Sequence, residues 1–391
     1  MKTYDELIKK TKIPQLFVFG AYRSGTTIIA RSLAGVKNIA FASDPIRPFF
    51  NYYRTKIQKE IGLSDLKKSN EPLSDYFNAN DDYLKYLLNS NFSESISSTE
   101  LVEIRDKVIQ QGSGYSPRFT DNLKKSSKID SLNYSEELKL YLSLIMSTYG
   151  CSKTSLVGLK EVWSIEMALP ILNMIGDNAK ILIILRDPLD IAASSMSGPA
   201  NYSILSLARQ WRKQVVFYNF LKSIYPNSVE LLNYEDFCYN PVITLKTTLQ
   251  KFDKQTEFFL STELNPLDDY GNSWIKNSSY LNKENSKKID NKSIGKYKNF
   301  LHSSEIEWII YLTHMCSYKK YNHYNSSPEK PKSLFPKKNI NNVAEWAKSE
   351  ILSLEGDDLK QHLDLEQDRI NKMPSYTENK FKNINFITDQ V

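Results

Sequence analysis

The residues from Gly20 to Thr27, Gly-Ala-Tyr-Arg-Ser-Gly-Thr-Thr, have the spacing of a loop that binds phosphate. A glycine-bounded loop between a strand and a helix directs backbone N–H groups and the positive end of the helix dipole at one point, which suits an anion. Thr26 stands where the loop of nucleoside triphosphatases has a lysine, and the nearest cation is Arg23. The stretch therefore predicts a phosphate site that lacks the lysine of an ordinary kinase or ATPase.

A second set of polar residues follows the most apolar segment of the chain, residues 180–185. Asp187 and Pro188 fit the N-cap and the first position of a helix. Those roles leave Arg186 unexplained, a long cation at the carboxyl end of a strand, where open parallel sheets bind ligands. Ser194 follows eight residues later, about 10 Å along the helix. A phosphate lying beside this helix would reach both the arginine and the serine.

The elements that must position these residues alternate between apolar strands and amphipathic helices. The expected strands cover residues 16–19, 155–159, 180–185 and 229–234, with a short edge segment near residue 41. This alternation predicts an α/β fold with a P-loop-like central parallel β-sheet that is flanked by helices.

The rest of the chain adds two regions to this sheet. Residues 51–150 are polar, helical in pattern and rich in tyrosine. We expect them to form a helical insertion that covers the active site and binds a second substrate, the acceptor of the reaction. Residues 1–324 would form the catalytic domain, and the prolines of residues 325–338 indicate a linker. An amphipathic C-terminal helical extension would follow at 339–391, either making a homodimer or packing back on its own domain.

The composition limits the range of partners. The formal net charge of +6, from 51 Lys and Arg against 45 Asp and Glu, is too weak and scattered to predict nucleic-acid binding. No apolar run approaches the roughly 18 residues of a membrane span, and no signal sequence precedes the loop, so we expect no membrane and a cytoplasmic protein. The 3 cysteines and 4 histidines lack the spacing of metal ligands, so no metal is expected.

The two phosphate motifs, in this order, resemble those of the sulfotransferases that use 3′-phosphoadenosine 5′-phosphosulfate (PAPS). The first loop resembles their 5′-phosphosulfate loop, and Arg186 with Ser194 resembles their 3′-phosphate motif. Residues 233–237 are similar to a segment whose tyrosine lies near adenine, and residues 278–279 and 294–297 resemble a late loop that closes over the nucleotide. The resemblance covers about residues 16–324. It implies these donor-binding residues: Arg23, Ser24, Gly25, Thr26, Thr27, Arg186, Ser194, Tyr234, Ser278, Ser279, Gly295 and Lys296.

The resemblance also implies the chemistry. A sulfuryl group moves from PAPS to a hydroxyl or amine of a small-molecule acceptor by in-line displacement without a metal, and adenosine 3′,5′-bisphosphate (PAP) leaves. Arg23 and Lys160 would stabilise the charge that develops on the leaving phosphate. Many cytosolic members have Lys-Thr-His where this chain has Lys160-Glu161-Val162, so their histidine is absent here. The candidate bases are Asp44, which is equally well explained as an N-cap before Pro45, and Glu161.

Two other functions remain open from the sequence. A P-loop kinase or nucleotidase would use an acidic strand-end residue such as Asp187 to hold magnesium, although Thr26 argues against it. A family member without a working base would bind a nucleotide and catalyse nothing. PAP binding without magnesium separates the kinase from the other two, and a transfer assay separates the enzyme from the binder.

Overall fold

A computed structural model describes residues 13–62, 86–126, 130–196, 202–252, 263–274, 289–313 and 329–336, together with residues 360, 363 and 364. The centre of the fold is a five-stranded sheet in the order β2-β3-β1-β4-β5, with every neighbouring pair parallel. The strands are β1 (Gln15–Gly20), β2 (Ile39–Ser43), β3 (Leu156–Val162), β4 (Ala179–Leu185) and β5 (Val229–Asn233). The predicted α/β fold with a central parallel sheet and flanking helices is confirmed.

Helices connect the strands, as the predicted alternation of strands and helices requires. They are α1 (Thr26–Ala34), α2 (Arg47–Glu60), α4 (Ser98–Gly112), α5 (Pro117–Lys125), α6 (Tyr134–Tyr149), α7 (Ala168–Ile175), α8 (Pro188–Met196), α9 (Ile204–Ile224), α10 (Tyr234–Tyr239), α11 (Pro241–Phe252) and α12 (Ser303–Thr313). Three short 3₁₀ helices, η3 (Ile165–Met167), η4 (Gly176–Asn178) and η5 (Lys296–Asn299), lie between them.

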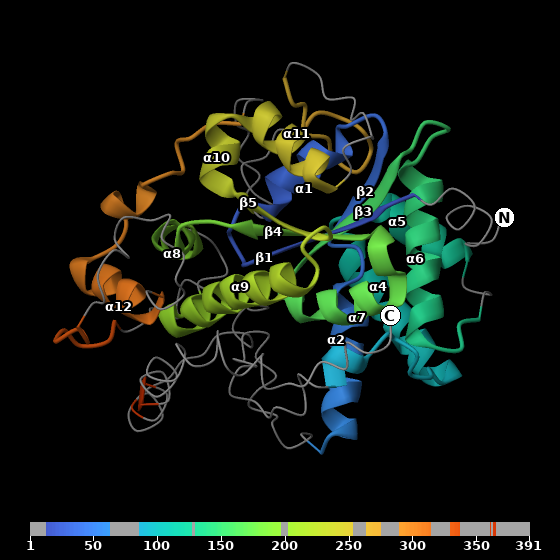
Figure 1. Cartoon of the computed structure of the whole chain (residues 1–391), viewed down its shortest axis with the longest axis horizontal. Coiled ribbons are helices and arrows are strands. Elements are labelled where there is room, and N and C mark those ends of the chain that lie inside the picture. The colour runs from blue at the N-terminus through green and yellow to red at the C-terminus, as the bar shows by residue number, and fades with distance from the viewer. Residues whose placement is uncertain are drawn as a thin grey trace.

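The two faces of the sheet are covered by different helices, because successive side chains of a strand point to opposite faces. Leu16 and Val18 of β1 belong to an apolar core with residues of α1, α10 and α11. Phe17 and Phe19 belong to a larger core with residues of α2, α4 to α9 and α12. Figure 1 shows α1, α10 and α11 on one side of the sheet and α7 and α9 on the other. The strands are thus buried on both faces, as their continuous apolar sequence predicts.

The region between β2 and β3 contains no strand in its described part and consists of α2, α4, α5, α6 and their connections. Its aromatic residues pack against one another: the ring centroids of Tyr53 and Phe92 lie 4.4 Å apart, and those of Phe49 and Tyr134 5.4 Å apart. Tyr53, Tyr134 and Tyr141 are fully buried. These tyrosines therefore stabilise the helical region from inside, through burial and ring contacts.

The C-terminal parts of the chain are described only in places. Phe335, within the expected linker, packs against Trp308 of α12 at 5.1 Å between ring centroids, and the Trp308 indole N–H donates to the Ser333 carbonyl. The expected helical extension at 339–391 lies outside the described residues apart from positions 360, 363 and 364.

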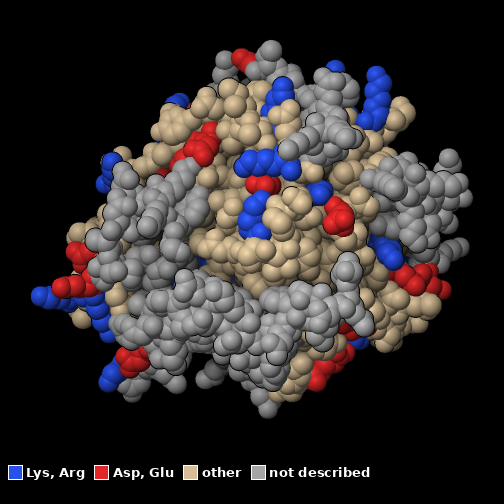
Figure 2. Space-filling model, in the orientation of Figure 1, with Lys and Arg blue, Asp and Glu red and all other residues tan. Residues whose placement is uncertain are grey.

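Figure 2 shows basic and acidic side chains of the described residues interspersed on one face of the molecule. Among these residues, no helix has both the length and the apolar composition that crossing a membrane requires.

Candidate functional site

Three neighbouring strands are followed by residues with left-handed backbone conformations. Arg23 follows β1 with φ 62°, Asp44 follows β2 with φ 52°, and Trp163 follows β3 with φ 65°. Of the other non-glycine residues that the structure describes, only Phe92 has a positive φ. Such conformations cost free energy and concentrate at functional sites. The carboxyl edge of β2, β3 and β1 is therefore the candidate site, at the edge where parallel sheets bind ligands.

The loop after β1 presents the N-terminus of α1. Gly25 is the N-cap of α1 with φ 85°, and no side chain caps the helix there. A Cβ at Gly25 would lie 2.1 Å from Cδ2 of Tyr234, and one at Gly20 would lie 2.5 Å from Cγ2 of Thr26. The hydroxyl of Ser24 donates to the Ala21 carbonyl at 2.6 Å and so stabilises the turn itself. The loop is closely packed, and the first N–H groups of α1 lack the side-chain cap that helix starts commonly have, which suits an anion.

Arg23 joins the two halves of the expected donor site. Its Nε donates to Oγ of Ser194 at 2.9 Å, and its carbonyl accepts from Nη1 of Arg186 at 3.0 Å. Arg186 is almost fully buried, and its guanidinium carbon lies 4.5 Å from the ring centroid of Tyr234. Four residues predicted from the sequence are thus brought together around one loop; Arg23 follows β1, Arg186 follows β4, and the other two lie on α8 and α10.

Two residues of α9 that the sequence did not single out for the site support this loop. The side-chain Oε1 of Gln210 accepts from the Tyr22 backbone N–H at 2.8 Å. The indole N–H of Trp211 donates to the Arg186 carbonyl at 2.8 Å. One turn of α9 therefore holds both phosphate motifs by their backbones. The available sequence signal is a polar residue, Gln210, in a helix whose apolar stripe predicts burial.

Residues 293–296, late in the chain, also contact Arg186 and Tyr234 of the expected donor site. Oγ of Ser293 lies 2.8 Å from the Tyr234 hydroxyl, and the Ser293 carbonyl accepts from Nη2 of Arg186 at 2.7 Å. Gly295 has φ 71°, and Nζ of Lys296 lies 4.5 Å from the Phe300 ring centroid. The predicted residues Ser278 and Ser279 lie outside the described part of the chain.

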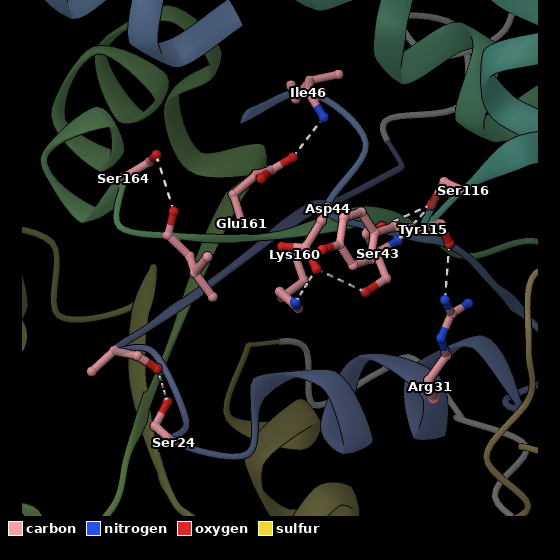
Figure 3. A network of polar contacts seen from close by, with 12 residues as sticks. Ser24, Arg31, Ser43, Asp44, Ile46, Tyr115, Ser116, Lys160, Glu161 and Ser164 are labelled. Atoms are coloured by element: carbon pink, nitrogen blue, oxygen red, sulfur yellow. Dashed lines mark hydrogen bonds and ion pairs between the residues drawn. The ribbon is translucent and has the colours of Figure 1, made fainter. Parts of the chain in front are cut away.

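The buried Lys160 and the partly buried Asp44 form an ion pair at the ends of β3 and β2 (Figure 3). The parallel register places Ser43 beside Lys160, and the Asp44 N–H donates to the Lys160 carbonyl at 2.8 Å. Lys160 is 1% exposed, and its ammonium group donates a hydrogen bond to Oδ2 of Asp44. Oδ1 of Asp44 is buried and accepts no hydrogen bond from the residues that the structure describes.

Glu161 lies next to this pair and is fully buried. Its Oε1 accepts from the Ile46 backbone N–H at 2.6 Å, while its Oε2 has no hydrogen-bond partner among the described residues. Burial, and then the neighbouring charge of Asp44, raise the pKa of Glu161 well above its ordinary value. Glu161 and Asp44 are thus neighbouring carboxyl groups with different partners, a backbone N–H for Glu161 and the Lys160 ammonium for Asp44.

The two Asp-Pro sequences of the chain have different roles. Oδ1 of Asp187 accepts from the Leu189 N–H at 2.9 Å, and α8 begins at Pro188, which confirms the predicted cap. The capping explanation of Asp44 is wrong, because α2 begins at Arg47 and Ile46 occupies its N-cap without a side-chain bond. Asp44 instead points to Lys160.

This edge of the sheet therefore combines an uncapped helix start, two arginines and a lysine–carboxylate pair. Such groups can hold a doubly charged phosphate ligand and accept a proton beside it. Within the described residues, no three His, Cys, Asp or Glu side chains gather in a way that could hold a metal ion.

Comparisons with known proteins give one family. A model of the family described as "Sulfotransferase family" matches residues 14–257. A sulfotransferase domain from the curacin biosynthetic pathway is similar in structure, with 15% identity over 75% of this chain and 95% of that chain and a TM-score of 0.39. A sulfotransferase domain from the Synechococcus PCC 7002 olefin synthase gives 14% identity over 76% and 93%, with a TM-score of 0.38. No curated protein sequence matches the chain.

Proposed function

Because the chain belongs to the sulfotransferase family, we propose that it transfers a sulfuryl group from PAPS to a hydroxyl or amine of a small-molecule acceptor. The observation that carries the proposal is the position of Arg23. This residue contacts Ser194 through its side chain and Arg186 through its carbonyl. A loop for one phosphate is thereby joined to an arginine–serine pair for another, as a ligand with phosphates at both its 5′ and 3′ positions requires.

The proposed donor site divides between these two groups. The N–H groups of Gly25, Thr26 and Thr27, the Ser24 turn and the Arg23 guanidinium would bind the 5′ end, because a helix N-terminus and a cation both favour anions. Arg186 and Ser194 would bind the 3′-phosphate. The ring of Tyr234, which packs against Gly25 and Arg186, would lie near the adenine. Lys296 and Gly295 belong to the segment that covers this end.

PAPS supplies the activated sulfuryl group in this proposal, and the protein supplies charge and a base. Lys160 and Arg23 would stabilise the negative charge that develops on the leaving 5′-phosphate. Asp44 would accept the proton of the acceptor, because its second oxygen is buried without a hydrogen bond from the described residues and Lys160 holds the first. General-base assistance of this kind typically contributes about 10²–10⁴-fold in rate.

Glu161 is the weaker candidate for the base. Its raised pKa favours the protonated acid, which cannot accept a further proton. Its Oε1 is also used to hold the Ile46 N–H, and so the start of α2. We assign Glu161 to positioning Asp44 and the strand end. The acceptor would approach from the side of α2 to α6, within residues 51–150.

Ligand-dependent thermal stabilisation tests the donor. We expect PAP to raise the melting temperature without magnesium, and to do so more than adenosine 5′-monophosphate, which lacks the 3′-phosphate. Stabilisation by magnesium–ATP alone would contradict the proposal and favour a kinase.

Transfer of labelled sulfate from PAPS to a panel of phenols, alcohols, sugars and amines then identifies the acceptor class. PAP binding together with no transfer to any acceptor class would leave a nucleotide-binding protein and contradict the catalytic part of the proposal.

A further inference from the structure

Asp190 occupies an unexpected place in the proposed 3′-phosphate site. It lies four residues after Arg186 and four before Ser194, so the three share one side of α8 and of the turn before it. It is 2% exposed. A carboxylate between two groups that bind a phosphate would repel that phosphate, unless its charge is used in another way.

The contacts of Asp190 show what its charge does. Oδ2 accepts from the Gly295 backbone N–H at 2.7 Å, and Oδ1 accepts from the Tyr297 backbone N–H at 3.1 Å. Both oxygens are therefore occupied by one short segment of the chain, more than 100 residues away in sequence. Bonds from backbone N–H groups to an ionised carboxylate are stronger than bonds between neutral groups. The left-handed conformation of Gly295 accompanies this arrangement.

The same segment is held from its other end by residues of the proposed donor site. Ser293 accepts from Arg186 through its carbonyl and bonds with Tyr234 through its hydroxyl. Residues 293–297 thus contact Arg186, Asp190 and Tyr234, and the three contacted residues come from the end of β4, from α8 and from α10.

We infer that Asp190 is a positioning residue, which docks residues 293–297 against α8 and so forms the wall of the site that retains the nucleotide. The inference rests on the proposed function, because the wall matters only if a nucleotide binds there. Asp190 itself does not touch the ligand in this account. Two backbone N–H groups and the nearby Arg186 favour its ionised form, although burial is the larger effect and raises the pKa of Asp190. Its two oxygens are directed at the wall by these bonds.

The inference and simple repulsion predict opposite results for Asp190→Asn. Asparagine cannot accept from both N–H groups in the same way, so the wall should loosen. We expect PAP affinity, measured by calorimetry, to fall roughly tenfold, the usual effect of losing a hydrogen bond to a charged group. Hydrogen exchange in the peptide covering residues 289–300 should also become faster without nucleotide, which a merely repulsive carboxylate would not cause.

Asp268→Asn is the matched control. Oδ1 of Asp268 also accepts from two backbone N–H groups, those of Tyr270 and Asn272 at 2.9 and 2.8 Å, in a different turn. This variant should speed exchange in its own turn and leave PAP affinity unchanged. If Asp190→Asn fails to fold, hydrogen exchange in the wild-type protein provides the test of the inference. PAP should slow exchange in residues 289–300 more than in residues 263–274.

The outcomes separate this inference from the proposed function. Wild-type protein that binds PAP, with an Asp190→Asn variant that binds it equally or more tightly, overturns the role of Asp190 alone. The role of Asp190 is also overturned if PAP slows hydrogen exchange equally in residues 289–300 and 263–274. Wild-type protein that does not bind PAP overturns the proposed function and the inference together.

Discussion

Two fully buried glutamates, Glu161 on β3 and Glu166 five residues later on η3, have opposite surroundings. Glu166 lies in a structural ion cluster, where Arg54 donates to Oε1 at 2.8 Å and Nζ of Lys213 lies 2.6 Å from Oε2. Burial acts to raise the pKa of Glu166, but the charges of Arg54 and Lys213 outweigh it and lower the pKa. Glu161 has one backbone N–H and the carboxylate of Asp44 nearby, and its pKa is raised.

The difference separates a carboxylate that holds the fold together from a pair of carboxyl groups that are incompletely bonded. Around Glu166, both oxygens are occupied by cations on α2 and α9, so the cluster connects three parts of the structure. Oε2 of Glu166 has the Lys213 ammonium 2.6 Å away, although no hydrogen bond reaches it. By contrast, Oε2 of Glu161 and Oδ1 of Asp44 have neither a hydrogen bond nor an ion pair from the described residues, and Asp44 has a strained backbone. Perturbed and incompletely bonded groups of this second kind are typical of functional sites.

Removing the charge of Asp44 should give the largest effect. Asp44→Asn keeps the shape of the side chain but removes the proposed base, so we expect kcat for sulfate transfer to fall by about 10²–10⁴-fold. Steady-state kinetics with saturating PAPS measure it, and PAP affinity should change little. The matched control is Asp187→Asn in the other Asp-Pro sequence, since asparagine caps a helix as well as aspartate. Equal loss of kcat in the two variants would contradict the assignment.

Glu166→Gln should destabilise the folded protein, because it disrupts the structural ion cluster. It removes the carboxylate that faces two buried cations, and breaking a buried ion pair from one side typically costs about 3–5 kcal/mol. We expect the free energy of unfolding from urea titration to fall by this order, while the folded protein still binds PAP. A variant with unchanged stability would show that the cluster does not support the fold.

The pH dependence of the free energy of unfolding should also distinguish Glu161 from Glu166, with a smaller effect. A carboxyl group with a raised pKa stabilises the fold below its ordinary pKa of about 4.3, and this contribution is lost as the pH rises through the raised value. Glu161→Gln removes that loss, so its stability relative to the wild type should increase with pH, by up to about 1.4 kcal/mol per unit.

The contribution of Glu166 to stability should depend on pH in the opposite direction. Its lowered pKa means that its contribution is present above about pH 4.3 and is lost as the pH falls through the lowered value. The destabilisation by Glu166→Gln should therefore shrink in acid. Urea titrations over a range of pH would contradict the comparison if both variants changed in the same direction.

The sequence predicts well which residues gather around the loop after β1, because the signals are local. The glycines of the loop, the Asp187 cap and the apolar strand before Arg186 each follow from neighbouring residues, and the parallel sheet then brings the strand ends together. Five expected strand segments correspond to the five strands of the sheet.

Other contacts of the site could not be predicted to the same degree. Asp44-Pro45 and Asp187-Pro188 look alike, and only the pairing of β2 with β3, which places Ser43 beside Lys160, shows that Asp44 is no cap. The contacts of Gln210 with Tyr22 and of Asp190 with Gly295 join residues 188 and 105 positions apart. No local pattern specifies such contacts, since they depend on how whole helices pack on the sheet.

A crystal structure of the complex with PAP tests the central claim most directly. We expect the 5′-phosphate at the N–H groups of Gly25 to Thr27, and the 3′-phosphate between Arg186 and Ser194. Asp44 and Lys160 should face the 5′ end of the nucleotide. A nucleotide bound elsewhere, or a 3′-phosphate that contacts neither Arg186 nor Ser194, would contradict the account.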